Sequence, residues 1–120
     1  MAIVDDDESL RVATVRFVRS LGWQAKAYAS ALDFLDSGDA ETVACIISDV
    51  QMPDMTGLEM MRVLRARHCE APVICITAFC TEDVRQEALQ LGAAAFLCKP
   101  VKGAAFRIHL QEIAARLSHK

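Results

Sequence analysis

The sequence lacks the features of several large classes of protein. The 120 residues contain no apolar stretch long enough to span a bilayer. The first residues also lack the basic segment that is typical of a signal peptide. It also lacks a stripe of Lys and Arg, and its net charge is −3, which disfavours direct binding to nucleic acid. Phosphate-loop, dinucleotide-binding and nucleophile-elbow motifs are missing. We therefore expect one domain, residues 1–120, whose 53% apolar composition can bury a core without membrane association.

The cysteines and histidines lack the spacing of metal ligands. No C-x-x-C occurs, and the cysteines are five in number: Cys45, Cys69, Cys75, Cys80 and Cys98. An odd count without metal spacing is typical of reduced thiols, so we expect free cysteines that act as small core hydrophobes, and a cytoplasmic protein. The three histidines are scattered, and His119 is expected to be solvated in the terminal tail.

Apolar runs alternate with amphipathic stretches five times, which predicts an α/β fold with a parallel sheet and crossover helices. We expect strands at residues 2–4, 24–27, 43–48, 72–77 and 95–97. Ser30 and Thr81 are expected to cap the helices that follow them. The pattern is (βα)5 with helices on both faces of the sheet. A strand order of 2-1-3-4-5 would bring the first and third strands together at the switch point.

Charged and hydroxyl side chains occur at the carboxyl ends of four predicted strands. They are Asp5, Asp6, Asp49, Thr77 and Lys99. Open α/β sheets bind ligands at this edge, and clustered carboxylates repel unless a cation such as Mg²⁺ joins them. An aspartate can attack phosphorus to form an acyl phosphate. The phosphoryl oxygens would then be met by Mg²⁺, by the Lys99 ammonium, and by the Thr77 hydroxyl with the backbone N–H of Ala78.

Each of these residues also has a structural explanation of its own. The acids at residues 5–8 could cap the following helix, a role we assign to the last two of them. Asp49 could be a turn residue, Lys99 a solvated lysine, and Thr77 a strand residue or local cap. The combination favours a site, because these independent explanations would have to coincide at one end of one sheet.

Four segments together resemble the receiver domain of two-component response regulators. They are residues 4–7, 48–57, 76–78 and 96–100. The resemblance covers essentially the whole chain and implies a flavodoxin-like fold. It also implies a signalling module switched by phosphorylation, which catalyses its own phosphotransfer and dephosphorylation but is not an enzyme with turnover.

The resemblance implies a role for each site residue. Asp49 becomes the phosphoacceptor, and Lys99 binds the phosphoryl group next to a peptide bond that is often cis in the family. Asp6 is implied as the direct Mg²⁺ ligand beside Asp49, while Asp5 acts through water. Gln51 would contribute its backbone carbonyl to the metal.

The resemblance also implies a switch and partners. Thr77 would move toward the phosphoryl group while the ring of Phe96 turns inward. The output face would comprise residues 82–91, 94–97 and 106–112, and a homodimer could form through it. The phosphodonor would be a sensor histidine kinase or a phosphotransfer protein, with Arg11 and Val15 among the candidate kinase contacts.

Residues 28–35 and 48–57 are most similar to FixJ-type receivers, which usually precede a helix-turn-helix DNA-binding domain. No such domain lies in these 120 residues. We expect a fragment of a transcription factor or a stand-alone relative that lost its effector. Two alternatives stay open: an aspartate-nucleophile phosphatase using Asp5 and Asp7, and a pseudo-receiver that only binds partners.

Overall fold

The computed structural model describes residues 1–118 and contains a parallel sheet of five strands in the order β2-β1-β3-β4-β5. The strands are β1 (Ala2–Val4), β2 (Lys26–Tyr28), β3 (Ile46–Asp49), β4 (Val73–Thr77) and β5 (Ala95–Cys98). The predicted fold class, strand direction and strand order are confirmed. His119, expected in a solvated tail, lies outside the described residues.

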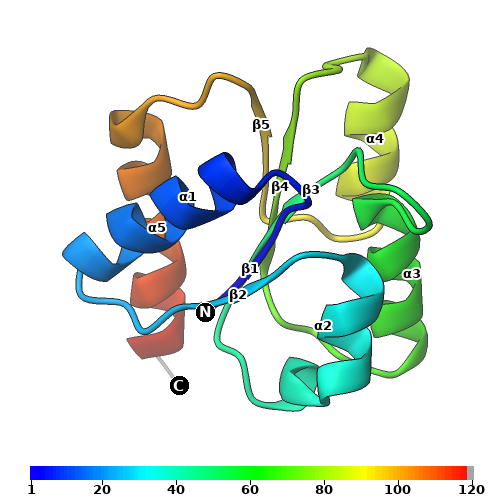
Figure 1. Ribbon diagram of the computed structural model, residues 1–120, viewed down its shortest axis with the longest axis horizontal. Helices are drawn as coiled ribbons and strands as arrows, with labels where there is room; N and C mark the ends of the chain where they lie inside the picture. Colours follow the sequence, from blue (N-terminus) through cyan, green and yellow to red (C-terminus); the bar gives the residue numbers. More distant parts are fainter. Residues whose placement is uncertain (119–120) are drawn as a thin grey trace.

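Helices cover both faces of the sheet, as the crossover pattern predicts. They are α1 (Glu8–Ser20), α2 (Ala31–Ser37), α3 (Gly57–Ala66), α4 (Glu82–Gln90) and α5 (Gly103–Ser118), with a short 3-10 helix, η1 (Asp39–Glu41). Figure 1 shows α1 and α5 on one face of the sheet and α2, α3 and α4 on the other. None of the helices in residues 1–118 has the length and apolar character needed to cross a membrane.

The strands supply side chains to an apolar core on each face. Ile46 packs with Phe34 and Leu64 beneath α2, α3 and α4, while its neighbour Ile47 packs with Leu110 beneath α5. This alternation follows from the two-residue repeat of a strand. It also explains why the run around β3 is apolar without interruption, since a central parallel strand is buried on both sides.

Side-chain caps begin the helices at the positions that the sequence predicts. The Ser30 hydroxyl accepts the Asp33 N–H at 3.0 Å, and the Thr81 hydroxyl accepts the Val84 N–H at 3.3 Å. Asp7 caps α1 by accepting the Leu10 N–H. Each cap satisfies a backbone donor that the first helical turn cannot pair.

Two strands are shifted from their predicted positions. The second strand is Lys26–Tyr28 instead of residues 24–27, and the third is Ile46–Asp49 instead of residues 43–48. The neighbouring strands set these limits. The three residues of β1 pair with Lys26–Tyr28 on one side and with residues 46–48 on the other, and β4 pairs with residues 46–49. Asp49 is thus the last residue of β3 and pairs with Ile76 of β4, one position beyond the ladder with β1.

The prediction that all cysteines are free is wrong for two of them. A disulfide joins Cys80, in the loop after β4, to Cys98, the last residue of β5. They are 18 positions apart in sequence, but the pairing of Thr77 with Cys98 brings the loop to β5. Their Cα atoms lie 5.9 Å apart, within the range that a disulfide requires. The other three cysteines are free, and two of these are buried as expected.

Candidate functional site

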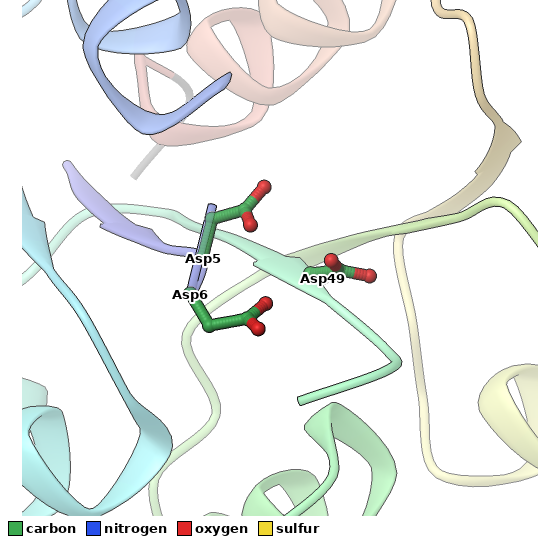
Figure 2. Close-up of side chains that lie close together, drawn as sticks. All are labelled: Asp5, Asp6 and Asp49. Atoms are coloured by element: carbon green, nitrogen blue, oxygen red, sulfur yellow. The ribbon is translucent and has the colours of Figure 1, made fainter. Parts of the chain in front are cut away.

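Three carboxylates meet where β1 and β3 end side by side. Val4 lies opposite Ser48 in the ladder, so the residues that follow each strand emerge at the switch point of the sheet. Ligand oxygens of Asp5, Asp6 and Asp49 all lie within 4.8 Å of one another. Figure 2 shows the three side chains projecting from these strand ends toward the same side of the sheet. The structure thus brings together the three acids singled out from the sequence.

Asp49 is buried, and both of its carboxylate oxygens have a protein partner. Oδ1 accepts the backbone N–H of Gln51 at 3.1 Å, and Oδ2 accepts a hydrogen bond from Nζ of Lys99 at 2.9 Å. The first bond follows from a local turn, since aspartate readily accepts an N–H two residues on. The second spans 50 positions of sequence and places a cation on the carboxylate.

Lys99 directly follows β5, the strand at the edge of the sheet, and its side chain reaches back to Asp49 at the end of β3. Its backbone N–H donates to the Thr77 carbonyl at 2.8 Å, which fixes the segment after β5, and its bond to Pro100 is cis. Nζ also lies 3.7 Å from Oδ2 of Asp5. Burial alone would lower the pKa of Lys99, but the hydrogen bond to Asp49 and the charge of Asp5 outweigh burial and raise this pKa. The side chain therefore stays a full ammonium.

Asp5 and Asp6 differ in their surroundings. Asp5 is buried, and its Oδ1 accepts the Asp7 N–H at 2.9 Å while its Oδ2 faces Lys99. Burial raises the pKa of Asp5, although the Asp7 N–H and the Lys99 charge act in the opposite direction. Asp6 is exposed. Asp6 is therefore the acid of the three that is most open to direct contact with a cation.

The remaining predicted residues lie on or just after β3, β4 and β5. Thr77 is fully buried at the end of β4, and its hydroxyl accepts the Phe79 N–H at 3.0 Å. Ala78 follows it in the loop and is exposed. Phe96 is half-buried in β5 and packs against the core beneath α2, α3 and α4. Gln51 is exposed just beyond β3, so its backbone lies beside Asp49. The roles of these four residues stay predictions.

Two positioning residues were not recognised from the sequence. Arg11, expected among the kinase contacts, donates from Nη1 to the Asp5 carbonyl at 2.8 Å and ties α1 to the acidic segment. Gly57 begins α3 so close to β3 that an added Cβ would lie 2.3 Å from the Asp49 carbonyl oxygen. The sequence did contain a signal for Gly57, which is its position eight residues after Asp49. The Arg11 contact depends on the tertiary fold, so the sequence contained no signal for it.

The donor set suits a hard divalent cation. All three side chains offer carboxylate oxygens, the ligands that Mg²⁺ prefers in proteins. Among the described residues, the Lys99 ammonium is the one lysine or arginine cation that forms ion pairs with these carboxylates. The three acids therefore keep an excess of negative charge. A divalent cation held by Asp6 and Asp49 would offset that excess.

The raised pKa of Asp5 predicts a gain in stability from Asp5→Asn. The pKa of Asp5 is higher in the folded state than in the unfolded state. Ionisation of Asp5 therefore begins to disfavour folding as the pH rises above the unfolded-state pKa, and the penalty is complete above the folded-state pKa. The variant should therefore raise the free energy of unfolding at neutral pH by on the order of 1 kcal/mol, an amount kept small by solvent screening. Urea unfolding in the presence of a chelator measures this. The gain should vanish at acidic pH, and a pH-independent gain would contradict the assignment.

The comparisons with known proteins agree with this fold and identify its family. The sequence profile of the response regulator receiver domain matches residues 1–111. The chain is 38% identical over 103 residues to the transcriptional regulatory protein FixJ of Azorhizobium caulinodans, covering 86% of this chain and 49% of that protein. It is 35% identical over 98 residues to the DNA-binding transcriptional regulator NtrC of Proteus hauseri, covering 82% of this chain and 21% of NtrC. The chain belongs to the receiver domains of two-component response regulators.

Solved structures share the fold over nearly the whole chain. The crystal structure of FixJ-N superposes with a TM-score of 0.84 at 29% identity, covering 95% of this chain and 91% of that one. The chemotaxis protein CheY4 of Vibrio cholerae gives a TM-score of 0.85 at 27% identity, covering 93% and 95%. The chain spans about half the length of FixJ and less of NtrC. It is a signalling module of the two-component class.

Proposed function

We propose that Asp49 accepts a phosphoryl group from a phosphohistidine of a sensor kinase or phosphotransfer protein, and that this switches the output face. The observation that carries the proposal is the buried Asp49 carboxylate, hydrogen-bonded to the Lys99 ammonium at the switch point of a receiver fold. The carboxylate supplies the nucleophile, and the ammonium supplies charge to the oxygens of the incoming group.

In the proposed step an Asp49 carboxylate oxygen attacks phosphorus. An O–P bond forms, the N–P bond of the phosphohistidine breaks, and the electron pair stays on the imidazole nitrogen, which takes up a proton. Lys99 moves its contact from the carboxylate to a phosphoryl oxygen, while the Thr77 hydroxyl and the Ala78 N–H meet another. Later attack of water on phosphorus releases phosphate and restores the carboxylate.

Mg²⁺ is the cofactor that we propose for this chemistry. Asp6, Asp49 and the backbone carbonyl of Gln51 would hold it, with Asp5 acting through water. When bound, it neutralises carboxylate and phosphoryl charge. Arg11 and the Asp7 N–H hold the Asp5 segment in place, so the acidic pair keeps its position before the cation binds.

Intact mass spectrometry after incubation with acetyl phosphate and Mg²⁺ tests the proposal. We expect one phosphoryl adduct that is absent with a chelator and absent in Asp49→Asn. Asp54→Asn is the matched control, because Asp54 is an exposed residue of the same loop with φ 69°, a conformation that asparagine also adopts. It should keep the adduct. A folded, Mg²⁺-binding protein without an adduct would favour a pseudo-receiver.

The phosphatase alternative loses its second aspartate. Asp7 caps α1, is exposed, and is not part of the acidic cluster in the described residues. An Asp5 and Asp7 catalytic pair is therefore not assembled, whereas the Asp49 loop and Lys99 are both accounted for by the receiver chemistry. Turnover of small phosphoesters by the Asp49→Asn variant would revive the phosphatase.

For the output, we propose a transcriptional response exerted through a DNA-binding effector on a longer protein or a partner. The support is that FixJ and NtrC are described as transcriptional regulators. The face made by α4, β5 and α5 carries Leu89 and Ile108, which are exposed apolar side chains suited to a homodimer. On α1, the exposed Leu10 and Val12 suit a kinase contact better than Arg11, which is engaged with Asp5. We place this phosphorelay in the cytoplasm.

Phe79 is expected to slow the loss of the phosphoryl group. The residue is 62% exposed in the loop after Thr77. We expect its bulky apolar ring to limit the approach of water to the acyl phosphate. Phe79→Gly should therefore lose the adduct several-fold faster, as followed by intact mass after removal of the donor. Phe79→Ala separates the loss of the ring from the added backbone freedom of glycine. A longer-lived adduct in Phe79→Gly would contradict this prediction.

A further inference from the structure

Cys80 and Cys98 are the cysteines that lie beside the proposed phosphorylation site. Both are exposed, so small thiols and disulfides in solvent can reach them. Cys45 and Cys75 are buried, and burial raises the pKa of each thiol to about 12, which keeps them unreactive. Cys69 is half-buried and lies near the Ala40 carbonyl, away from the site. Thiol chemistry near the acids is therefore confined to the pair.

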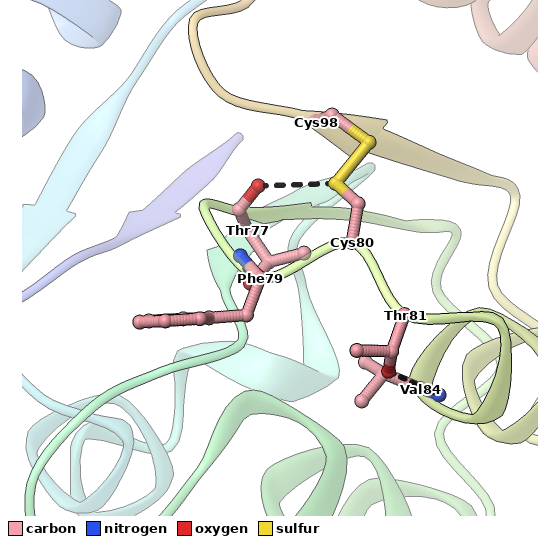
Figure 3. Close-up of a disulfide and its surroundings, with 6 residues drawn as sticks. All are labelled: Thr77, Phe79, Cys80, Thr81, Val84 and Cys98. Carbon is pink, nitrogen blue, oxygen red and sulfur yellow. Dashed lines mark hydrogen bonds between the residues drawn. A yellow bond between two sulfur atoms is a disulfide. The ribbon is translucent and has the colours of Figure 1, made fainter.

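The disulfide connects the start of α4 to the end of β5. Figure 3 shows it bridging the loop that leaves β4 and the strand β5, with Thr81 beside it. Thr81 is the N-cap of α4 and directly follows Cys80. Cys98 ends β5 and directly precedes Lys99. Two segments of the proposed output face are thus joined next to the proposed phosphate-binding lysine.

Both joined segments meet at the carbonyl of Thr77. The Lys99 N–H donates to this oxygen at 2.8 Å, and Sγ of Cys80 lies 3.5 Å from it, the contact dashed in Figure 3. A disulfide sulfur has no proton, so in this state the sulfur only contacts the oxygen. The reduced Cys80 thiol could donate a weak hydrogen bond there instead. The bridge and the hydrogen bond from the Lys99 N–H to the Thr77 carbonyl therefore close a small ring, which contains the backbone of Thr77, Ala78 and Lys99.

We propose that Cys80 and Cys98 form a reversible thiol–disulfide switch, and that the disulfide disfavours phosphorylation of Asp49. This inference rests on the proposed function of Asp49. A phosphoryl group can enter only if Lys99 gives up Asp49 and the Thr77 hydroxyl, now accepting the Phe79 N–H, turns toward the new group. The turn of Thr77 breaks its hydrogen bond with the Phe79 N–H, so the loop at residues 78–80 must rearrange to pair that N–H again. The bridge ties Cys80 of this loop to β5 and opposes the rearrangement.

The proposed reaction is thiol–disulfide exchange with a low-molecular-weight disulfide such as oxidised glutathione. The thiolate of one cysteine attacks the disulfide, forming a mixed disulfide and releasing one small thiol. The thiolate of the second cysteine then attacks the protein sulfur of the mixed disulfide and releases the other small thiol. The protein pair loses two electrons and two protons, and the small disulfide is reduced to two thiols. Reversible disulfides of this kind are typical of redox sensing inside cells.

Thermodynamic linkage makes the proposal testable from both sides. If the bridge lowers affinity for a phosphoryl group, then a bound phosphoryl group must make the bridge easier to reduce by the same factor. Beryllofluoride, an anion that mimics a phosphoryl group, allows this measurement at equilibrium with Mg²⁺ in excess. We expect oxidised protein to bind it at least about fivefold more weakly than reduced protein, a typical coupling between two sites.

The experiment compares protein equilibrated in oxidised and reduced glutathione. Alkylation and peptide mass mapping report the Cys80–Cys98 bridge, calorimetry reports beryllofluoride affinity, and hydrogen exchange reports the amides of residues 78–82. The double variant Cys80→Ser/Cys98→Ser, which can form neither the bridge nor a mixed disulfide at these positions, should bind beryllofluoride equally in both buffers and match reduced wild type. Cys69→Ser, which keeps the pair, should retain the full redox dependence.

The readouts separate the failure of this inference from the failure of the proposed function. A pair that does not oxidise, or one whose oxidation leaves beryllofluoride affinity unchanged, overturns the switch. If neither redox form binds beryllofluoride, the proposed function fails, and hydrogen exchange then decides whether the bridge holds the loop. Equal exchange at residues 78–82 in both forms overturns the restraint, and slower exchange in the oxidised form supports it.

Discussion

Replacing Lys99 with alanine is expected to slow phosphoryl acceptance from acetyl phosphate by on the order of 10²-fold. The Lys99 ammonium lies 2.9 Å from Asp49 and 3.7 Å from Asp5, and in the described residues no other ammonium or guanidinium forms an ion pair with these acids. Without it, the transferred group would face carboxylates with one less cation to meet its oxygens. The initial rate of adduct formation, followed by intact mass, measures the effect.

Two further variants show whether charge alone is enough. Lys99→Arg keeps the charge but replaces a compact ammonium with a planar fork, so we expect it to restore only part of the rate. Lys102→Ala is the matched control, since Lys102 is an exposed lysine three residues further on and should keep the wild-type rate. Wild-type rates in Lys99→Ala would show that the ammonium only pairs the carboxylates of the resting protein.

Replacing Gly57 with alanine is expected to lower the free energy of unfolding by on the order of 3 kcal/mol. The added Cβ would lie 2.3 Å from the Asp49 carbonyl oxygen and 3.1 Å from Oγ of Ser48. The carbonyl belongs to the backbone of the buried strand β3 and cannot rotate away as a side chain could, so α3 must shift. The shift would strain the hydrogen bond that the Gly57 N–H donates to the Val50 carbonyl, which has an N···O distance of 2.9 Å. Urea unfolding gives the change in stability.

Gly103→Ala provides the matched control for that loss. At Gly103 an added Cβ would meet the ring edge of Phe17 at 3.3 Å, a side-chain contact that a small ring movement relieves. Alanine also favours the helical backbone that glycine penalises. We expect a change within about 1 kcal/mol. Equal losses in the two variants would mean that the approach of α3 to β3 is not the cause, and reduced phosphorylation of folded Gly57→Ala would link the contact to Asp49.

Local patterns in the sequence were sufficient to predict the elements and their order. A strand repeats every two residues and a helix every 3.6, so apolar spacing separates the two without tertiary information. Caps such as Ser30 and Thr81 act within one turn and are equally local. The convergence of Asp5, Asp6 and Asp49 was also predictable, because parallel strands bring their carboxyl ends to one edge.

Long-range pairing decided what the sequence could not. The limits of β2 depend on its pairing with β1, and those of β3 on its pairing with β1 and β4, which neither strand encodes in its own residues. The Cys80–Cys98 bridge was missed because cysteine counting finds no partner for residues 18 positions apart until β4 and β5 are paired. The reach of Arg11 to the Asp5 carbonyl depends likewise on how α1 packs.

Local periodicity and the geometry of parallel sheets were enough to predict the fold class and the acids of the site, whereas the strand order was expected from the resemblance to receiver domains. How those acids are held depends on long-range packing. It placed Lys99 on Asp49, Gly57 against the Asp49 carbonyl, and Cys80 against Cys98. The lysine and cysteine contacts join residues 50 and 18 positions apart, and the distances in all three contacts are set by packing, which no short segment specifies.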